Sequence, residues 1–281
     1  MGLSRQDLEA KRLIREINKL FYQSEEPDEL SLARIRRGAL SLRAHNGHAA
    51  NLVLARIAAL LGREGPMRTS HQLIINAIGH HPEVHKDYSE SLRKLGFYSE
   101  ARDSALLAHR RDPENTDYLQ LLIKASIVAG CFQQAWEAFD KAIKANARVM
   151  TSQFNFLMAS RKFLLGVAID DSQLEAVQIL AMGLLRRAGL FPWGVLRSPA
   201  VHMELMAGEK PPEGDALGGE HGLLLWEVQV PVLSAEVVGR LNDDLFEAIQ
   251  SSPLLDQVKS RIRFRYVPRG RRPMLNTGFH Y

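Results

Sequence analysis

The sequence predicts a mainly α protein, in which a solenoid of helical hairpins is followed by a small C-terminal α/β module. A pattern of glycine, aromatic and alanine residues recurs with an offset of 34 residues, which is the period of a helix-turn-helix repeat. Apolar residues follow helical spacing up to about residue 190. A stretch rich in glycine and proline then precedes residues whose apolar positions alternate as in a strand.

The repeat is clearest in the two segments that begin near Gly96 and Gly130. Each glycine permits a positive φ and lets the first helix of a hairpin end tightly. The aromatic residue two positions later fills the gap between the two helices, and small alanines on the second helix let neighbouring helices approach closely. The matching positions are Gly96 and Gly130, Tyr98 and Phe132, Ala101 and Ala135, and Ala108 and Ala142.

These positions resemble the tetratricopeptide repeat (TPR) family, and the resemblance implies an α-solenoid built from stacked hairpins. The sequence departs from the family's pattern at Ala105, Ser126 and Ala147, where a large residue, an aromatic residue and a proline are usual. The first unit carries the family's residue types at Tyr88, Ser89, Leu92, Gly96, Tyr98, Ala101, Ala108 and Pro113, and the second carries them at Leu122, Ile123, Gly130, Phe132, Ala135, Phe139 and Ala142.

The resemblance also implies a binding surface, because TPR proteins usually bind peptides on the concave face of the solenoid. A mixture of charges on that face suits an extended or helical polar peptide. The alternative, for any one of these residues, is an ordinary solvated position. By resemblance, the partner-binding residues expected on the concave face are Glu83, Lys86, Glu90, Arg93, Asp117, Gln120, Lys124 and Ile127.

Four helices are expected before the two clear repeat units. Ser4 is a suitable N-cap for the first, which runs to about residue 22. The second and third cover residues 30–44 and 49–61, with a turn between them. Gly65-Pro66 is expected to break the chain before a helix over residues 68–78, which Pro82 closes.

Arginines occupy the polar side of the helix predicted over residues 30–44. Such a row has two interpretations, a solvated helix face or a surface for an acidic partner, and the solvated face is the simpler one. The arginines are Arg34, Arg36, Arg37 and Arg43.

Residues 154–166 and 172–188 are expected to form a last helical hairpin. Asp171-Ser172 is expected to supply the N-cap of its second helix. The hairpin lacks the glycine–aromatic turn of the repeats. We therefore interpret it as a cap that covers the last apolar face of the array.

The predicted domains are a TPR-like array over residues 1–190, a Gly/Pro-rich linker or loop over 191–222, and a small module over 223–281. In the module, strands are expected over residues 223–232 and 261–267, and Ser234 caps a helix that runs to about residue 250. A module of about 60 residues is short for independent stability. It is therefore expected to lean on the array or on a partner.

Positive charge is concentrated at the C-terminal end of the chain. The formal net charge is +4, and residues 252–281 carry seven basic residues and one acidic residue. The segment either binds nucleic acid or another anionic polymer, or it protects an edge strand from aggregation by its charge. The anion-binding candidates are Arg261, Arg263 and Arg265, which share one face of the strand, and Arg269, Arg271 and Arg272.

The sequence contains no catalytic or metal-binding motif that would define an enzyme. Its one cysteine, Cys131, is interpreted as a small buried residue, and no intrachain disulfide can form. The histidines lack the spacing of metal ligands, and there is no phosphate-binding loop or nucleophile elbow. No catalytic residue, metal site or cofactor is therefore expected. The open alternative is an enzyme site formed around Trp193, His202, Glu204 and His221.

A looser resemblance links the C-terminal module to the 2-oxoglutarate/iron oxygenase domains that follow TPR arrays in some bacterial proteins. Leu241-Asn242-Asp243-Asp244-Leu245 and the later Arg269-Gly270-Arg271 are similar, in order, to the front of such a domain. The iron ligands would lie beyond Tyr281. The resemblance implies a remnant of such an oxygenase, or an accessory to one, without its chemistry.

The function that the sequence favours is a non-enzymatic adaptor or scaffold, which binds another protein on its concave face and uses the basic module as a second contact site. Nucleic-acid or anionic-polymer binding and the oxygenase remnant are the alternatives. No apolar run reaches the length of about 18 residues that suggests a membrane span, and the N-terminus lacks an apolar signal region. A cytoplasmic, bacterial-type location is therefore expected.

Overall fold

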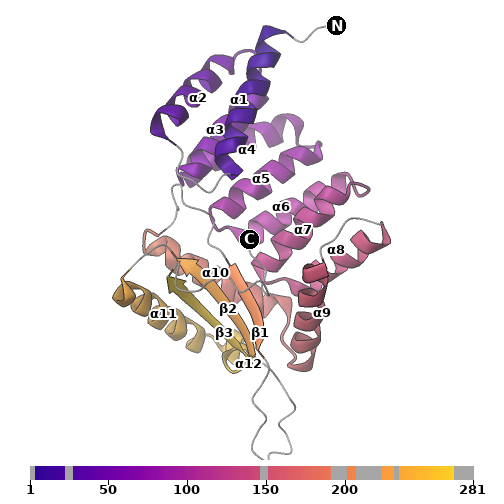
Figure 1. The fold of residues 1–281 in the computed structure, drawn as a ribbon, viewed down its shortest axis with the longest axis vertical. Coiled ribbons are helices and arrows are strands. Elements are labelled where there is room, and N and C mark those ends of the chain that lie inside the picture. The colour runs from indigo at the N-terminus through magenta and orange to yellow at the C-terminus, as the bar shows by residue number, and fades with distance from the viewer. Residues whose placement is uncertain are drawn as a thin grey trace, which may run out of the picture. The chain divides into compact units, whose positions relative to one another are not determined.

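The computed structural model describes residues 4–22, 28–145, 151–190, 201–206, 223–230 and 234–268. Helices dominate, and a small three-stranded sheet forms from the C-terminal part of the chain (Figure 1). This confirms the predicted fold class, mainly α with a small α/β module. None of the helices in the described ranges is long and apolar enough to cross a membrane.

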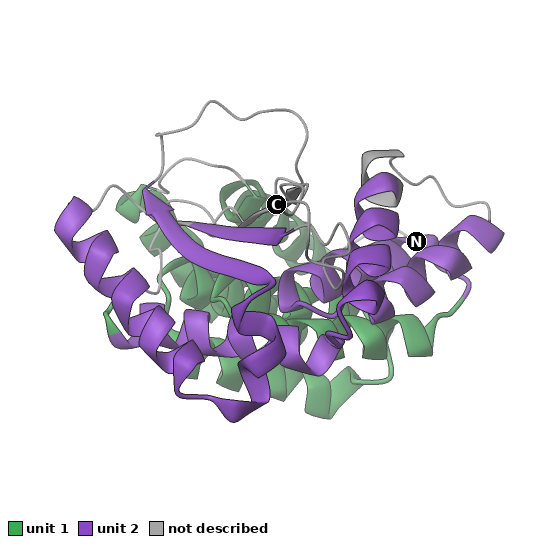
Figure 2. Cartoon of the chain, turned by 90° about the horizontal axis from the view of Figure 1, so that it is seen from below, with its two compact units in different colours: residues 1–113, 188–198 green, residues 114–187, 199–281 purple. Residues whose placement is uncertain are grey.

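The chain divides into two compact units (Figure 2). Unit 1 comprises residues 1–113 with 188–198, and unit 2 comprises residues 114–187 with 199–281. The helices of residues 116–187 therefore belong to the same unit as the sheet. The domain boundaries expected at residues 190 and 222 stay a prediction.

The described part of unit 1 contains the helices α1 (Arg5–Tyr22), α2 (Glu29–Leu42), α3 (Gly47–Leu60), α4 (Glu64–Ile78), α5 (Pro82–Lys94) and α6 (Tyr98–Arg111). Helix α3 packs against α4, α5 packs against α6, and α1 contacts both α2 and α3. Successive helices that pack as neighbours are the arrangement of a helical repeat.

Short polar side chains start the first three helices, as the sequence predicts for Ser4. The Ser4 Oγ accepts a hydrogen bond from the Asp7 N–H at 3.1 Å, and an Asp7 carboxylate oxygen accepts one from the Ser4 N–H at 3.2 Å. This reciprocal pair satisfies backbone donors that have no partner inside the helix. The side chains of Asp28 and Asn46 accept N–H hydrogen bonds at the beginning of α2 and α3, so they also act as N-caps.

Helix α4 begins four residues earlier than predicted, so the expected break at Gly65-Pro66 is wrong. Both residues lie in the first turn of α4. Proline is tolerated there because the first backbone N–H groups of a helix have no intrahelical acceptor to lose. Pro82 likewise starts α5 as its first residue, whereas the sequence suggested that it closes the preceding hairpin.

The described part of unit 2 combines helices with the sheet. The helices are α7 (Thr116–Ala129), α8 (Phe132–Lys144), α9 (Thr151–Gly166), α10 (Asp171–Arg187), α11 (Ala235–Gln250) and α12 (Asp256–Lys259), with a 3₁₀ turn, η1, over Pro253–Leu255. The strands are β1 (Val201–Met206), β2 (Leu223–Val230) and β3 (Ile262–Pro268).

The sheet has the order β1-β2-β3, with β2 in the centre. Strand β3 runs parallel to β2, with Phe264 opposite Trp226, and α11 lies between them in the chain. The predicted strand-helix-strand module is therefore confirmed. Strand β1 pairs antiparallel to β2, with Met203 opposite Trp226, and was not predicted. Its residues alternate between apolar and polar types from Val201 to Leu205, which is a strand signal that its short length obscured.

Strand β2 is buried on both faces, although the alternation of apolar positions in the sequence is typical of a strand with one buried face. Residues 224–228 and Val230 are all buried. A central strand between two others has no free edge, and its two faces are covered here. The charged residue in this strand, Glu227, is only 2% exposed and forms an ion pair with Arg265 of β3.

Tyr266 of β3 connects the sheet to two helices that precede this strand in the chain, α10 and α11. Its hydroxyl donates a buried hydrogen bond of 2.6 Å to the carbonyl of Ala181 in α10. Its backbone N–H donates to the Asn242 side chain of α11 at 2.8 Å, and the Asn242 amide donates back to the Tyr266 carbonyl at 3.1 Å. The module therefore leans on α10, in keeping with the expectation that it does not stand alone.

Gly130 ends α7 in the left-handed conformation that the repeat pattern predicts, with a φ of +87°, and Gly96 has a φ of +73°. A Cβ atom on Gly130 would also lie 2.9 Å from the backbone of Leu174 in α10. Glycine is therefore required at position 130 both for its φ angle and for its lack of a side chain. Cys131, next in the chain, is buried as expected.

The expected N-cap at Asp171-Ser172 is wrong, because Asp170 performs this role. The Asp170 carboxylate accepts from the Gln173 N–H at 3.0 Å, and the Gln173 side chain accepts from the Asp170 N–H at 3.1 Å. Asp171 instead accepts hydrogen bonds from the N–H groups of Gln133 and Gln134, at 2.9 and 3.1 Å. It therefore caps the first turn of α8 from another helix.

We expect Gly130→Ala to lower the free energy of unfolding by about 1–3 kcal/mol, because a left-handed non-glycine residue is strained and the new methyl group meets the Leu174 backbone. Gly239→Ala, in the interior of α11, is the matched control. A Cβ atom there meets no atom within 4 Å, and alanine should raise the free energy of unfolding by about 0.5–1 kcal/mol. Chemical denaturation of both variants measures the difference. Equal effects of the two substitutions would contradict this account of Gly130.

Candidate functional site

Three acidic side chains of α5 lie on one side of the helix. Glu83, Asp87 and Glu90 are separated by four and then three residues, and this spacing places them one above the other. Glu83 and Glu90 are among the predicted concave-face residues. Asp87 is not, although its position on the helix lies between them.

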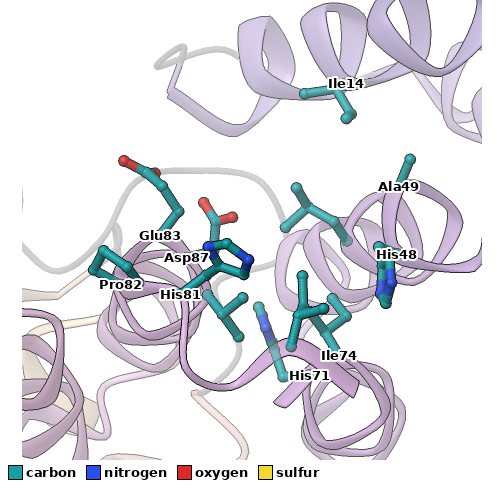
Figure 3. Close-up of a pocket in the computed structure, with 12 residues that line it drawn as sticks. Ile14, His48, Ala49, His71, Ile74, His81, Pro82, Glu83 and Asp87 are labelled. Carbon is teal, nitrogen blue, oxygen red and sulfur yellow. The ribbon is translucent and has the colours of Figure 1, made fainter. Parts of the chain in front are cut away.

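A pocket of about 510 Å³ in unit 1 begins at this side of α5 (Figure 3). Helices α1, α3 and α4 contribute the other walls, and in Figure 3 Ile14 of α1 lies across the pocket from Glu83 and Asp87. Most of the lining is apolar. The lining residues are Ile14, Ala49, Leu52, Ile74, Ile78, Pro82 and Val84, together with the polar His48, His71, His81, Glu83 and Asp87.

A buried arginine of α3 forms ion pairs with two of the carboxylates of α5. Arg56 of α3 is 3% exposed, and its Nη2 lies 2.6 Å from Asp87 and 3.4 Å from Glu90. The guanidinium also lies over the rings of Phe21 and Tyr22 of α1, at 5.2 and 5.6 Å from their centroids. One side chain therefore links α1, α3 and α5, the helices that form three walls of the pocket.

The cluster around Arg56 contains two carboxylates and one guanidinium. The Tyr22 hydroxyl donates a hydrogen bond to Glu90. Burial, and secondarily Glu90, raise the pKa of the Tyr22 phenol, so this hydroxyl stays a donor at neutral pH. Burial also raises the pKa of the Asp87 carboxyl to about 6, although Arg56 acts in the opposite direction.

His71 is neutral at the base of the pocket. Its ring is fully buried against Tyr88, and its Nε2 lies 2.9 Å from the Ser91 hydroxyl. Burial, and secondarily Arg56, lower the pKa of His71 to about 3. The neutral imidazole of His71 therefore adds no charge to the mostly apolar lining of the pocket.

Lys94, one helical turn beyond Glu90, is held by backbone and aromatic groups. Its Nζ donates to the Phe21 carbonyl at 2.9 Å and lies 5.3 Å from the centre of the Phe21 ring. Burial, and secondarily Arg93, lower the pKa of the Lys94 ammonium to about 8. Lys94 therefore ties the end of α5 to the end of α1.

The eight predicted concave-face residues are divided between the two units. In unit 1, Glu83 lines the pocket and pairs with Lys86 at 3.1 Å, while Glu90 joins the Arg56 cluster and Arg93 is half-buried. In unit 2, Asp117 is exposed, Gln120 and Lys124 are half-buried, and Ile127 is fully buried. Their role in binding a partner stays a prediction.

Along residues 261–266, which we call the arginine strand, exposed or half-buried arginines alternate with buried apolar and aromatic residues, as the sequence predicts. Ile262, Phe264 and Tyr266 are buried, whereas Arg263 is exposed and Arg261 and Arg265 are half-buried. Arg265 is already engaged, because its Nε donates to Glu227 at 2.8 Å and its Nη2 donates to the same carboxylate. Arg269, Arg271 and Arg272 lie outside the described residues.

Two of the four residues of the alternative enzyme site, Trp193 and His221, lie outside the described residues. His202 and Glu204 lie on β1, opposite Glu227 and Leu225 of β2. Within the described ranges, no three histidine, cysteine, aspartate or glutamate side chains are grouped so that they could hold a metal ion.

Comparisons with protein-family models and with curated proteins identify no relative of this chain. The assignment of the candidate site therefore rests on the geometry of its own residues.

Sequence reasoning missed Arg56 and His71. Arg56 stands among Val53, Ala55, Ile57 and Ala58, and an arginine within such an apolar run is the signal that could have identified it. No local pattern indicates His71, because its burial depends on the packing of α5 against α4.

We expect Asp87 and His71 to change the free energy of unfolding in opposite directions as the pH rises from 4 to 6. The pKa of Asp87 is about 6 in the folded chain against 3.8 as its ordinary value, so its contribution to the free energy of unfolding is lost as the pH rises through 6. The pKa of His71 is about 3 against 6.5, so its contribution is lost as the pH falls below 6.5.

Chemical denaturation as a function of pH checks this expectation. The stability difference of Asp87→Asn from wild type should become more favourable to the variant as the pH rises from 4 to 6. The stability difference of His71→Gln from wild type should become less favourable to the variant over the same pH interval. Difference curves with the same slope would contradict the assignment.

We expect Arg265→Gln to lower the free energy of unfolding by about 2 kcal/mol, because Glu227 would be left buried with less of its charge compensated. Arg263→Gln, on the same strand and exposed, should change it by less than about 0.5 kcal/mol. Chemical denaturation compares the two variants. Similar losses of unfolding free energy in both variants would show that the loss of the Arg265–Glu227 ion pair does not cause the destabilisation.

Proposed function

We propose that the protein is a non-enzymatic adaptor of TPR-like helical repeats, which binds a segment of another protein at the pocket of unit 1. The observation that carries the proposal is the pocket itself. It offers about 510 Å³ with a mostly apolar lining, and it includes Glu83 from the set of residues expected on the concave face.

The dimensions and chemistry of the pocket suit an apolar anchor residue of a partner. Ile14, Leu52, Ile74 and Ile78 supply apolar surface, and burying one leucine- or phenylalanine-sized side chain there contributes about 1.5–3 kcal/mol. A small number of anchors of this kind dominates the affinity of many protein interfaces. The polar groups at the edge, Glu83 and Asp87, can accept hydrogen bonds from the backbone or from a cationic residue next to the anchor.

The buried charges support a preorganised site. Arg56 holds α3 to α5 through Asp87 and Glu90, and to α1 through the rings of Phe21 and Tyr22. A pocket whose walls are joined in this way loses little conformational freedom when a ligand enters, which favours binding.

The adaptor proposal is preferred to anionic-polymer binding because of the contact made by Arg265. Its guanidinium is paired with the buried Glu227, so Arg261 and Arg263 are the candidates from the described part of the arginine strand that remain for phosphate contacts. Two such contacts give only modest, salt-sensitive binding.

We expect Leu52→Asp to abolish capture of the partner, because it places a carboxylate in the apolar lining of the pocket. Full-length wild type and variants would be used as bait in lysate of the cells that make the protein, followed by quantitative mass spectrometry and by binding measurements with the purified partner. Leu73→Asp is the matched control, since Leu73 is an exposed leucine of α4 that does not line the pocket.

The outcome that supports the proposal is one protein that wild type and Leu73→Asp retain and that Leu52→Asp loses by at least tenfold. Thermal unfolding confirms that both variants fold. A retained set that is the same for all three proteins, or a catch that consists of nucleic acid, would refute binding at this pocket.

A further inference from the structure

A second hollow of unit 1, which we call the α2 groove, lies between α2, α3 and α4. Its volume is about 490 Å³. Apolar side chains form its floor, and two arginines stand on its edges. The residues that define it here are Leu32, Leu54, Ile57 and Leu61 on the floor, and Arg36 and Arg63 on the edges.

The α2 groove and the pocket use opposite sides of α3. The pocket takes His48, Ala49 and Leu52 from this helix, whereas the groove takes Leu54 and Ile57 and the adjoining Leu61. Since successive residues turn by about 100°, the centres of the two sets are roughly 180° apart around the helix axis. The two sites are therefore lined by different side chains, and one can be changed without changing the other.

The two arginines at the edges of the groove form no ion pair within the described part of unit 1. Among the arginines of α2, Arg34 lies 3.3 Å from Glu16. Arg36 and Arg63 are exposed, and neither has a carboxylate within ion-pair distance among the described residues. Glu29, at the beginning of α2, is the acidic residue among those that line the groove.

The floor of the groove is recessed and apolar. Leu32 and Ile57 are 5% and 4% exposed, whereas Leu40, at the side of the groove, is 47% exposed. The lining residues of α2 recur every three or four positions, at Glu29, Leu32, Arg36 and Leu40, so the groove follows the axis of this helix. A groove that runs along a helix, with apolar residues below and cations at its edges, matches a second helix of opposite charge.

We propose that the α2 groove binds an acidic amphipathic helix of a partner protein. Leucine-like residues of that helix, spaced three or four apart, pack on Leu32, Leu54 and Ile57. Aspartate or glutamate residues at its margins form ion pairs with Arg36 and Arg63. This site is separate from the pocket of the proposed function, so the chain can hold two partners through one helix, α3.

The observations favour a protein helix over a nucleic acid or an anionic membrane. Phosphates and sugars have no apolar groups to fill the floor around Leu32 and Ile57. A membrane surface requires a row of apolar side chains that project outward, whereas Leu32 and Ile57 are recessed and Leu40 is the one exposed leucine of this lining. Charge complementarity with Arg36 and Arg63 then selects an acidic helix rather than a basic one.

The test uses a phage-displayed library of helical peptides in which the surface positions vary among Leu, Ile, Asp, Glu, Lys, Arg and Ser. The library is selected on the full-length protein, and the affinities of synthesised peptides are measured by fluorescence anisotropy. We expect the enriched peptides to be acidic and amphipathic. We also expect their affinity to fall at least tenfold in the variant Arg36→Glu with Arg63→Glu, and to fall as the salt concentration rises.

Matched controls separate the groove from general charge effects. Arg37→Glu with Arg110→Glu makes the same change in net charge at two exposed arginines that do not line the groove, and it should reduce affinity less than threefold. Because all four positions are exposed, the variants are expected to fold, and circular dichroism confirms this. Leu52→Asp should leave the affinity of the acidic peptides unchanged, so failure of the pocket proposal is distinguishable from failure of this one.

Three results would overturn the inference. The first is a selection that yields no helix, or yields peptides without acidic residues. The second is an affinity that the Arg36 and Arg63 substitutions do not lower more than the control substitutions do. The third is that duplex DNA, or vesicles of phosphatidylserine and phosphatidylcholine, bind through Arg36 and Arg63 while the acidic peptides do not.

Discussion

The buried guanidinium of Arg56 is the interaction on which unit 1 depends most. A charge that is 3% exposed must be compensated, and Asp87 and Glu90 do this from α5 while Phe21 and Tyr22 cover it from α1. Its Nε and Nη1 have no hydrogen-bond partner among the described residues, so the aromatic faces are a substantial part of that compensation. This arrangement joins α1 to α3 and α5 beside the pocket, in addition to the apolar packing of Leu13 and Ile17 in the core of unit 1.

Unit 2 relies instead on close backbone approach and on polar groups that bridge distant elements. Gly130 brings the end of α7 against the backbone of α10, and Asp171 of α10 caps the first turn of α8. Tyr266 then connects the sheet to α10 through one buried hydrogen bond. These contacts tie a module too small for independent stability to helices of the same unit, and Trp226 of its central strand packs against Phe132 of α8.

Helix α3 gives unit 1 two different surfaces. One side forms the apolar pocket that we propose for an anchor residue, and the other forms the floor of the α2 groove between Arg36 and Arg63. A helix that is apolar on more than one side is normally covered by its neighbours on all of them. The two hollows beside α3 are therefore places where that cover is incomplete.

The sequence by itself determined the existence of the helices α1 to α11, the positive φ of Gly96 and Gly130, the caps at Ser4 and Ser234, and the strand-helix-strand order, because each of these depends on residues close together in the chain. It did not determine β1, the position of Pro66 inside α4, or the true partners of Asp171 and Arg265. Only the tertiary structure decided that Arg56, Asp87 and His71 meet at one pocket. Their burial and their shifted pKa values arise from side chains contributed by separate helices, and no local pattern specifies which helices will pack together.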